Sequence, residues 1–148
     1  MSKIQHIDIP NYTTISGKTI PINLSYQLFG CALQSAPVVL VNHALTGNSN
    51  VTGSEGWWNA LIGPNKPIDT NLFSVLAFNI PGNGFDGNPN HLIDNYKDFI
   101  ARDIAELFLL GLKALRVDQL FAVIGGSLGG CIAWEMAAIN PKITKHLI

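Results

Sequence analysis

Charged side chains are scarce in this sequence. Its 148 residues include 9 Lys or Arg and 10 Asp or Glu, which amounts to 13% of the chain and a formal charge of -1. Soluble domains carry about 25% charged residues, and a nucleic-acid or anionic-membrane surface needs an excess of cations. The balance therefore argues against both partners. Because hydrophobic residues make up an ordinary 47%, the deficit is in surface charge, and we expect the chain to be the interior portion of something larger.

Cysteine is also rare, and no long apolar run occurs. Cys31 and Cys131 are predicted to be packed thiols in a reducing compartment. They lie far apart without metal-ligand spacing, so no metal is expected. The N-terminal residues lack the apolar segment of a secretory signal, which predicts a cytoplasmic protein. The uncharged run between Asp118 and Glu135 is too short and too glycine-rich to span a bilayer.

Short apolar and β-branched runs predict the strands of a sheet. Residues 37–41, 72–78 and 120–124 are almost continuously apolar, which is typical of strands covered on both faces in a parallel sheet. Residues 19–29 largely alternate apolar and polar side chains and predict a half-exposed antiparallel edge strand. A further strand is predicted to open at residues 145–148.

Helical patterns separate these strands. Between residues 96 and 115, apolar side chains recur at three- and four-residue steps, and Asn95 is the expected N-cap. Shorter helices are predicted over residues 57–62 and 127–139. Alternating strands and helices predict an α/β fold, a mostly parallel sheet with helices on both faces. We expect residues 1–148 to form the N-terminal part of a single domain without an internal boundary.

The acidic residues of the long predicted helix allow two interpretations. Asp98, Asp103 and Glu106 fit a solvated helix face, on which Arg102 can pair with acidic neighbours. Alternatively, Asp103 braces a neighbouring loop.

The sequence Gly-Gly-Ser-Leu-Gly at residues 125–129 carries the chemistry. It matches G-x-S-x-G and stands at the junction between the most apolar predicted strand and the following helix, where a nucleophile elbow belongs. Ser127 would sit in a strained turn with its oxygen above the sheet, and flanking glycines would let the strand and the helix approach closely. The alternative is a glycine-rich helix start in which the serine is an N-cap.

A serine nucleophile needs a base for its proton and donors for the oxyanion. The backbone N–H of Leu128, at the helix N-terminus, is one expected donor. The second is expected from the loop after the first buried strand, residues 42–47, through the backbone N–H of Leu45 or a neighbour. His43 lies directly after this strand, so an orienting hydrogen bond is preferred over a role as general base.

The acid and the base of a catalytic triad have no evident candidates. In elbow enzymes the order along the chain is serine, acid, histidine, and only Glu135 and His146 follow Ser127. Glu135 lies inside the elbow helix and His146 at the start of the next predicted strand, so neither is placed like a triad partner. We expect the chain to be truncated after the elbow helix and nearly inert by itself.

Three parts of the sequence resemble the homoserine O-acetyltransferase family, whose members transfer acyl groups on an α/β-hydrolase fold. They are Asn-His-Ala-Leu-Thr-Gly at residues 42–47, Trp-Trp at 57–58 with Leu-Ile-Gly-Pro at 61–64 and Ile-Asp-Thr at 68–70, and Gly-Gly-Ser-Leu-Gly-Gly at 125–130. The resemblance covers residues 20–148 and implies the N-terminal portion of such an enzyme. The family's lid, later acid and final histidine would lie beyond residue 148.

The resemblance implies a ping-pong reaction in methionine biosynthesis. Ser127 would take an acetyl or succinyl group from acyl-CoA, a co-substrate, and the hydroxyl of homoserine would then attack the acyl-enzyme. The backbone N–H groups of Leu45 and Leu128 would stabilise the oxyanion. No bound cofactor is implied, and the partners are these small molecules, with a homodimer of the full-length protein allowed.

Two other functional classes share the residues visible here. One is a serine esterase of the same fold, in which water accepts the acyl group. The other is a catalytically incomplete fragment, which the low charge content and the interrupted sheet favour. Such a fragment would expose a sheet edge and an apolar face and would tend to associate.

Glycine spacing offers one rival site. Gly82, Gly84 and Gly87 fit G-x-G-x-x-G after a strand, with Asp103 near the position of a ribose-binding acid. A dinucleotide site needs the third glycine at a helix start, whereas residues 88–90 separate it from the predicted helix. A tight surface turn of asparagine and glycine is therefore preferred.

Overall fold

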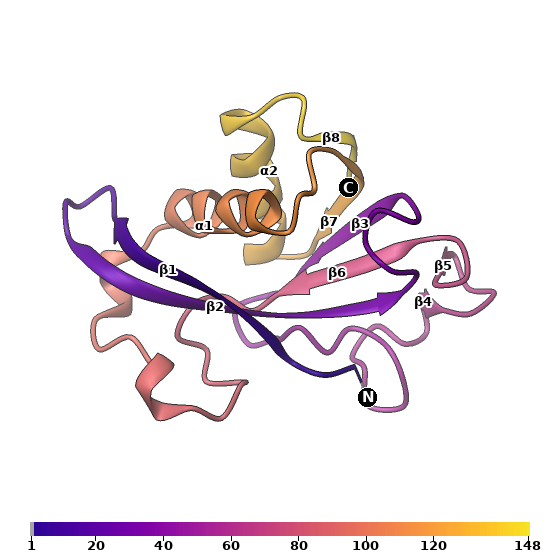
Figure 1. Ribbon diagram of the computed structural model, residues 1–148, viewed down its shortest axis with the longest axis horizontal. Helices are drawn as coiled ribbons and strands as arrows, with labels where there is room; N and C mark the ends of the chain where they lie inside the picture. The colour runs from indigo at the N-terminus through magenta and orange to yellow at the C-terminus, as the bar shows by residue number, and fades with distance from the viewer. Residues whose placement is uncertain (1) are drawn as a thin grey trace.

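A six-stranded sheet lies at the centre of the computed structural model, which describes residues 2–148. The strand order is β1-β2-β6-β3-β7-β8, and β4 and β5 form a separate two-stranded sheet (Figure 1). The strands are β1 (Gln5–Thr13), β2 (Thr19–Gly30), β3 (Val38–Asn42), β4 (Ile62–Gly63), β5 (Ile68–Asp69), β6 (Ser74–Phe78), β7 (Leu120–Gly125) and β8 (Thr144–Leu147). β6, β3, β7 and β8 run parallel, whereas β1 and β2 are each antiparallel to the next strand in this order. The predicted mostly parallel sheet is confirmed.

The three predicted apolar strands form as β3, β6 and β7, although Phe121 of β7 is exposed, and the C-terminal strand is confirmed. Every residue of β3 and β6 is buried, as expected for strands with neighbours on both sides and cover on both faces. Leu40 and Leu76 point into one core cluster, whereas Val39 and Val75 point into a second cluster on the opposite face. Because successive side chains alternate between faces, a slip of one residue would exchange the two clusters.

Strand β1 is not predicted by the sequence patterns, and its presence changes the place of β2. The two strands pair antiparallel, with a shift in register between Ile9 and Tyr12. Pro10 and Asn11 fall within this shift, where a proline is tolerated because the ladder is interrupted. β2 is therefore an interior strand between β1 and β6, and the prediction of an edge strand is wrong.

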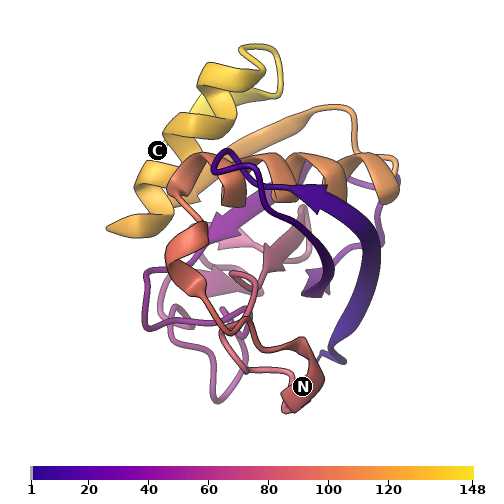
Figure 2. The same ribbon diagram turned by 90° about the vertical axis from the view of Figure 1, so that its left-hand side faces the viewer.

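Both α-helices, α1 (Ala101–Ala114) and α2 (Leu128–Ile139), cover the same face of the sheet (Figure 2). Phe108 of α1 and Met136 of α2 belong to one core cluster with strand residues of that face. On the opposite face Val51, Ile62 and Ile68, from the segment between β3 and β6, pack on the strands. The predicted helix at residues 127–139 is confirmed, but the prediction of helices on both faces is wrong for residues 2–148. Loops and short strands occupy the second face.

α1 begins later than predicted. The prediction of a helix over residues 57–62 is wrong, because residues 57–61 form turns and Ile62 begins β4. Residues Tyr96–Asp98 form a separate 3-10 turn, η2, and the Asn95 side chain makes no capping hydrogen bond. Instead, the Asp103 carboxylate accepts a hydrogen bond from the backbone N–H of Ile100 at 3.0 Å. This bond satisfies a donor that the first turn of α1 would otherwise leave free.

Asp103 is fully buried rather than solvated. Its carboxylate accepts hydrogen bonds from the Tyr12 hydroxyl at 2.9 Å and from the backbone N–H groups of Ile15 at 2.9 Å and Ile100 at 3.0 Å. A solvated face is the wrong interpretation for this residue, and bracing of a neighbouring loop is the right one. The Tyr12 hydroxyl also lies 3.0 Å from Glu106. Burial, and then the hydrogen bonds to these two acids, raise the pKa of Tyr12.

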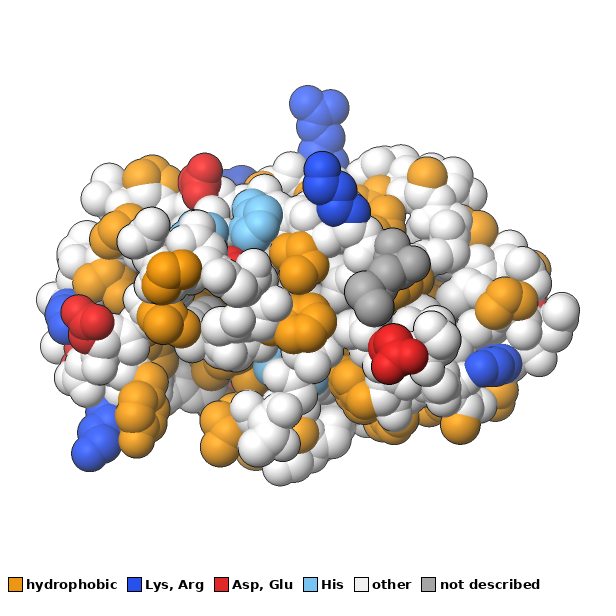
Figure 3. Space-filling view, turned by 90° about the horizontal axis from the view of Figure 1, so that it is seen from below, with side chains coloured by type: hydrophobic (Ala, Val, Ile, Leu, Met, Phe, Trp, Pro, Cys, Tyr) orange, Lys and Arg blue, Asp and Glu red, His pale blue; other side chains and the backbone are white. Residues whose placement is uncertain are grey.

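Charged side chains are scattered among hydrophobic and neutral ones over the face that Figure 3 shows, and they form no basic patch there. Cys31 is partly buried, but Cys131 is exposed, so the prediction of two packed thiols is wrong for Cys131. The cause is its place on the outer side of α2, which the apolar composition of that helix conceals. Within residues 2–148, no helix has both the length and the apolar character needed to cross a membrane.

Candidate active site

Ser127 lies in the sharp connection between β7 and α2. Its backbone has φ 56° and ψ -126°, a left-handed conformation that is strained for a residue with a side chain. The residue is exposed, and its hydroxyl makes no capping hydrogen bond to the helix. An N-cap serine has an extended backbone and accepts a hydrogen bond from the first turn. The alternative of an ordinary N-cap is therefore wrong, and the geometry is that of a strained strand-to-helix turn.

Two glycines allow β7, α2 and β3 to meet around this turn. A Cβ atom on Gly125 would overlap the carbonyl oxygen of Gly129, and a Cβ atom on Gly129 would overlap the carbonyl oxygen of Asn42 at the end of β3. These neighbours are backbone atoms of packed elements, which cannot move aside without disturbing the packing. By contrast, a Cβ atom on Gly126 would meet nothing within 4 Å. The outer glycines of G-x-S-x-G are thus the ones that the packing requires.

The two predicted oxyanion donors border one cavity. Leu45, in the loop after β3, and Leu128, the first residue of α2, both line a cavity of ≈ 250 Å³. Apolar side chains from the segment before α1 and from α1 itself, such as Phe99 and Ile104, line it as well. The N–H of Leu128 is the first backbone donor of α2, at the end of the helix where N–H groups favour negative charge. The structure therefore brings the two predicted donor residues together beside the elbow.

His43 holds the loop after β3 in place. Its ring is buried, with Nδ1 2.7 Å from the carbonyl oxygen of Ala44 and Nε2 3.0 Å from the backbone nitrogen of Ile80. Because the Ile80 N–H can only donate, Nε2 accepts and Nδ1 carries the ring proton. Burial lowers the pKa of His43, although its hydrogen bond to Ala44 opposes that shift. Both ring nitrogens are occupied, so the predicted orienting role is confirmed over that of a general base.

A buried polar network, which the sequence analysis missed, fixes the same loop to β6 and β2. The backbone N–H of Ser49 donates to Oδ1 of Asn79 at 2.8 Å, and the Ser49 hydroxyl donates to Oε1 of Gln27 at 2.8 Å. Asn79 in turn donates from Nδ2 to the hydroxyl of Ser25 at 2.9 Å. Buried polar groups are costly unless hydrogen-bonded, so this network specifies one loop position. The only sequence signal was a polar residue, Asn79, directly after a buried strand.

Glu135 and His146, which follow Ser127 in the sequence, are engaged with other partners. Glu135 lies eight residues beyond Ser127 in α2, which is about 12 Å along the helix axis, and pairs with Arg102 at 3.2 Å. His146 lies on β8, where its ring packs against Phe121 with the ring centroids 4.9 Å apart. Neither Glu135 nor His146 therefore belongs to the site around Ser127.

The glycine-rich loop after β6 is not a dinucleotide site. Gly82, Gly84 and Gly87 have φ values of 80°, 72° and 73°, which glycine adopts easily in turns. Two 3-10 turns, η1 (Pro89–His91) and η2, follow, and α1 begins only at Ala101. The third glycine therefore does not open an α-helix, as phosphate binding in such a site requires. The preferred surface turn is confirmed.

Known proteins share this arrangement of strand, elbow and helix. A family model described as the alpha/beta hydrolase fold matches residues 37–148, which include β3, Ser127 and α2. The chain belongs to the alpha/beta hydrolase fold family. In this family, G-x-S-x-G at the strand-to-helix turn carries the nucleophile. The predicted fold class is thereby confirmed.

Within this family, the chain is similar to homoserine acyltransferases and to esterases. The homoserine O-acetyltransferase of Methanococcus vannielii is 36% identical over 95% of this chain and 32% of that protein. Among solved structures, homoserine O-acetyltransferase from Bacillus anthracis superposes with a TM-score of 0.83 and 29% identity over 97% of this chain and 45% of that chain. Esterase E22 superposes with a TM-score of 0.84 and 27% identity over 99% of this chain and 46% of that chain. The chain of this alpha/beta hydrolase thus spans less than half the length of each of these three proteins.

Proposed function

We propose that Ser127 is the nucleophile of an acyltransferase that moves an acetyl or succinyl group from acyl-CoA to the hydroxyl of homoserine. The elbow carries the proposal, because it presents an exposed serine with a left-handed backbone between a buried parallel strand and a helix N-terminus. The substrates are supported by the similarity to proteins named homoserine O-acetyltransferase. Both of these proteins are named for the transfer of an acetyl group, so acetyl is the acyl group tested first.

The reaction would proceed in two halves through an acyl-serine. In the first half, Ser127 Oγ attacks the thioester carbonyl carbon while a base takes the hydroxyl proton; the C–S bond then breaks, and the thiol leaves with that proton. In the second half, the hydroxyl of homoserine attacks the serine ester, its proton passes through the base to Oγ, and O-acyl homoserine leaves. The serine hydroxyl is thereby restored, and no atom is lost.

Each half of this reaction places negative charge on the former carbonyl oxygen. The backbone N–H groups of Leu45 and Leu128 would donate to that oxygen, and loss of one such donor typically slows acyl transfer about 10²–10³-fold. The cavity of ≈ 250 Å³ that both residues line would receive the acyl group. The acid and the histidine that activate the serine follow it along the chain in this family, and within residues 2–148 neither Glu135 nor His146 takes that place.

A serine esterase is the second candidate, and the superposition with esterase E22 favours it specifically. The esterase would use the same elbow and the same oxyanion donors, but water would attack the acyl-serine and release a carboxylic acid. The two functions therefore share the acyl-serine and differ in the acceptor that attacks it. A test must vary the acceptor rather than the nucleophile.

The test measures acetyl-CoA consumption by the protein expressed from its complete open reading frame, with and without homoserine. We expect consumption that depends on homoserine, and O-acetyl homoserine as the product. Ser127→Ala should abolish it, whereas Ser54→Ala, which removes a hydroxyl from another exposed serine, should leave it unchanged. Consumption that is indifferent to homoserine would replace the transferase by the esterase, and unchanged turnover of Ser127→Ala would remove Ser127 as the nucleophile.

A further inference from the structure

Three potential metal ligands converge outside the candidate active site. His6 lies on β1, whereas Asp86 and His91 belong to the loop between β6 and α1. Oδ2 of Asp86 lies 2.6 Å from Nδ1 of His91 and 3.9 Å from Nδ1 of His6. One ligand atom of each residue lies within 4.8 Å of the other two. Two segments that are 80 residues apart in the sequence thus bring two imidazoles and a carboxylate together. Nδ1 of His6 also donates a hydrogen bond to Oδ1 of Asn23 at 2.6 Å, which a metal ion would replace.

We propose that His6, Asp86 and His91 form a binding site for a divalent transition-metal ion of the Zn²⁺ class. Zn²⁺ binds imidazole nitrogen and carboxylate oxygen at about 2.0–2.2 Å, often with three protein ligands and a water in the fourth position. Ligand atoms around a tetrahedral ion with such bonds lie about 3.3–3.6 Å apart. The observed separations fall on both sides of this spacing, so side-chain shifts of about 1 Å would seat the ion.

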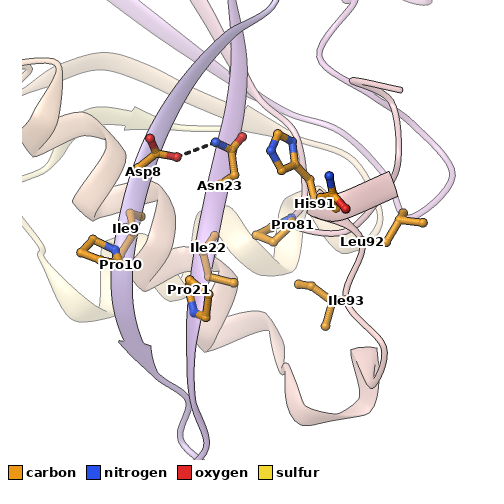
Figure 4. Close-up of a pocket in the computed structure, with 11 residues that line it drawn as sticks. Asp8, Ile9, Pro10, Pro21, Ile22, Asn23, Pro81, His91, Leu92 and Ile93 are labelled. Carbon is orange, nitrogen blue, oxygen red and sulfur yellow. Dashed lines mark hydrogen bonds between the residues drawn. The ribbon is translucent and has the colours of Figure 1, made fainter. Parts of the chain in front are cut away.

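There is room for an ion beside these ligands and a route to reach them. A polar cavity of ≈ 10 Å³, lined by Asn23, Asp86 and His91 among others, has about the volume that one water molecule needs. His91 also borders a larger cavity of ≈ 310 Å³, where it lies beside Asn23 and Asp8 (Figure 4). The His6 and His91 side chains are 38% and 24% exposed, so an ion can enter from solvent.

The Asp86 carboxylate supplies the charge that a cation requires. Its Oδ1 accepts a hydrogen bond from the backbone N–H of Asn88 at 3.1 Å, and its Oδ2 lies 2.6 Å from Nδ1 of His91. The carboxylate is only 6% exposed. A buried carboxylate that faces two imidazoles can accept a hydrogen bond from a ring N–H or bind a metal ion.

In the metal-free protein a proton takes that place. Oδ1 of Asn88 accepts a hydrogen bond from the backbone N–H of Asn90 at 3.0 Å, which directs its Nδ2 to Nε2 of His91 at 3.1 Å. Nε2 of His91 therefore accepts, and its Nδ1 carries the proton that faces Asp86. A metal bound at Nδ1 moves this proton to Nε2 and requires an acceptor there in place of the Asn88 amide nitrogen. Asn88→Asp supplies that acceptor and retains an oxygen for Asn90.

Calorimetric titration of the untagged protein, expressed from its complete open reading frame, with Zn²⁺ tests the site. We expect one ion per chain. His6→Ala and Asp86→Asn should each lower the association constant at least about tenfold, and Asn88→Asp should raise it about tenfold, because a carboxylate behind a ligating histidine strengthens the metal bond. His146→Ala removes an exposed histidine outside the cluster and should leave the titration unchanged.

The competing explanation is a loop clamp in which His91 only hydrogen-bonds to Asp86. It predicts no stoichiometric binding by the wild-type chain or by Asn88→Asp. That result would overturn the proposal, as would Zn²⁺ binding that survives His6→Ala. His6 is exposed on β1, so its replacement should leave the fold intact, and a circular dichroism spectrum of each variant checks this. The visible spectrum of bound Co²⁺ should also lose its tetrahedral bands in His6→Ala.

Discussion

Two alanine substitutions, Gly129→Ala and Gly126→Ala, test whether backbone packing at the elbow outweighs the helix propensity of alanine. Gly129 lies in the first turn of α2, where alanine is favoured over glycine by about 1 kcal/mol. A Cβ atom there would nevertheless overlap the carbonyl oxygen of Asn42 and lie 2.8 Å from that of His43. At Gly126, a Cβ atom would meet nothing within 4 Å, and φ is not positive. The two substitutions therefore add the same methyl group, which clashes with backbone atoms at residue 129 and meets open space at residue 126.

The structure sets the size of the expected difference. To admit alanine at Gly129, β3 and α2 must separate by about 1 Å, which removes favourable contacts along the whole interface. Overpacking ordinarily costs about 1–3 kcal/mol, and here the obstruction is backbone rather than a side chain that can rotate. We expect Gly129→Ala to lower the free energy of unfolding by at least about 3 kcal/mol. Gly126→Ala should raise it by about 0.5 kcal/mol, because the unfolded chain loses freedom.

Urea unfolding followed by far-ultraviolet circular dichroism measures both free energies. The denaturant slope must stay the same for the two variants, so that a change in midpoint reports stability alone. Equal midpoints for Gly129→Ala and Gly126→Ala would refute the close approach of β3 and α2 at the elbow.

Three further substitutions test other features of the chain. Asp103→Ala leaves two backbone N–H groups without their acceptor and should cost about 3 kcal/mol in urea unfolding; Glu106→Ala should cost less than about 1 kcal/mol, because the Tyr12 hydroxyl keeps Asp103. Since burial lowers the pKa of His43 below 6.5, the native state binds fewer protons than the unfolded state. The free energy of unfolding should thus fall as the pH is lowered through 6.5, and less steeply in His43→Gln; equal pH slopes would contradict this. Ser127→Gly should be about 1 kcal/mol more stable than Ser127→Ala, because glycine adopts φ 56° without strain; equal stabilities would mean that the turn is unstrained.

Local patterns were sufficient to predict the central strands and the elbow helix. β3 and β6 are buried on both faces and β7 over most of its length, so their sequences are almost continuously apolar. β1 escaped prediction because only part of its length alternates and Pro10 interrupts the ladder at the shift in register. The start of α1 was misplaced because its first-turn acceptor, Asp103, acts from within the helix rather than from the preceding residue.

Some residues of the candidate site could also be predicted from the sequence, and others could not. Ser127, Leu128 and the required glycines lie within five consecutive residues, so their spacing alone identifies the turn. Leu45 could be predicted because parallel strands β3 and β7 are neighbours and their carboxyl ends meet. The Ser49–Asn79 network and the His6–Asp86–His91 cluster depend on segments that meet only in the folded chain. No spacing along the sequence encodes such a contact.

Strain at Ser127 links the packing of the elbow to its proposed chemistry. A serine keeps a strained backbone with positive φ only where the surrounding structure enforces it. The close contacts at Gly125 and Gly129 supply that constraint. Stability and activity should therefore respond differently to the two kinds of substitution. Ser127→Gly should raise stability above that of Ser127→Ala while neither variant forms an acyl-enzyme, whereas Gly129→Ala should lose stability and also displace the N–H of Leu128. Normal acyl transfer in a destabilised Gly129→Ala protein would show that the close approach serves folding alone.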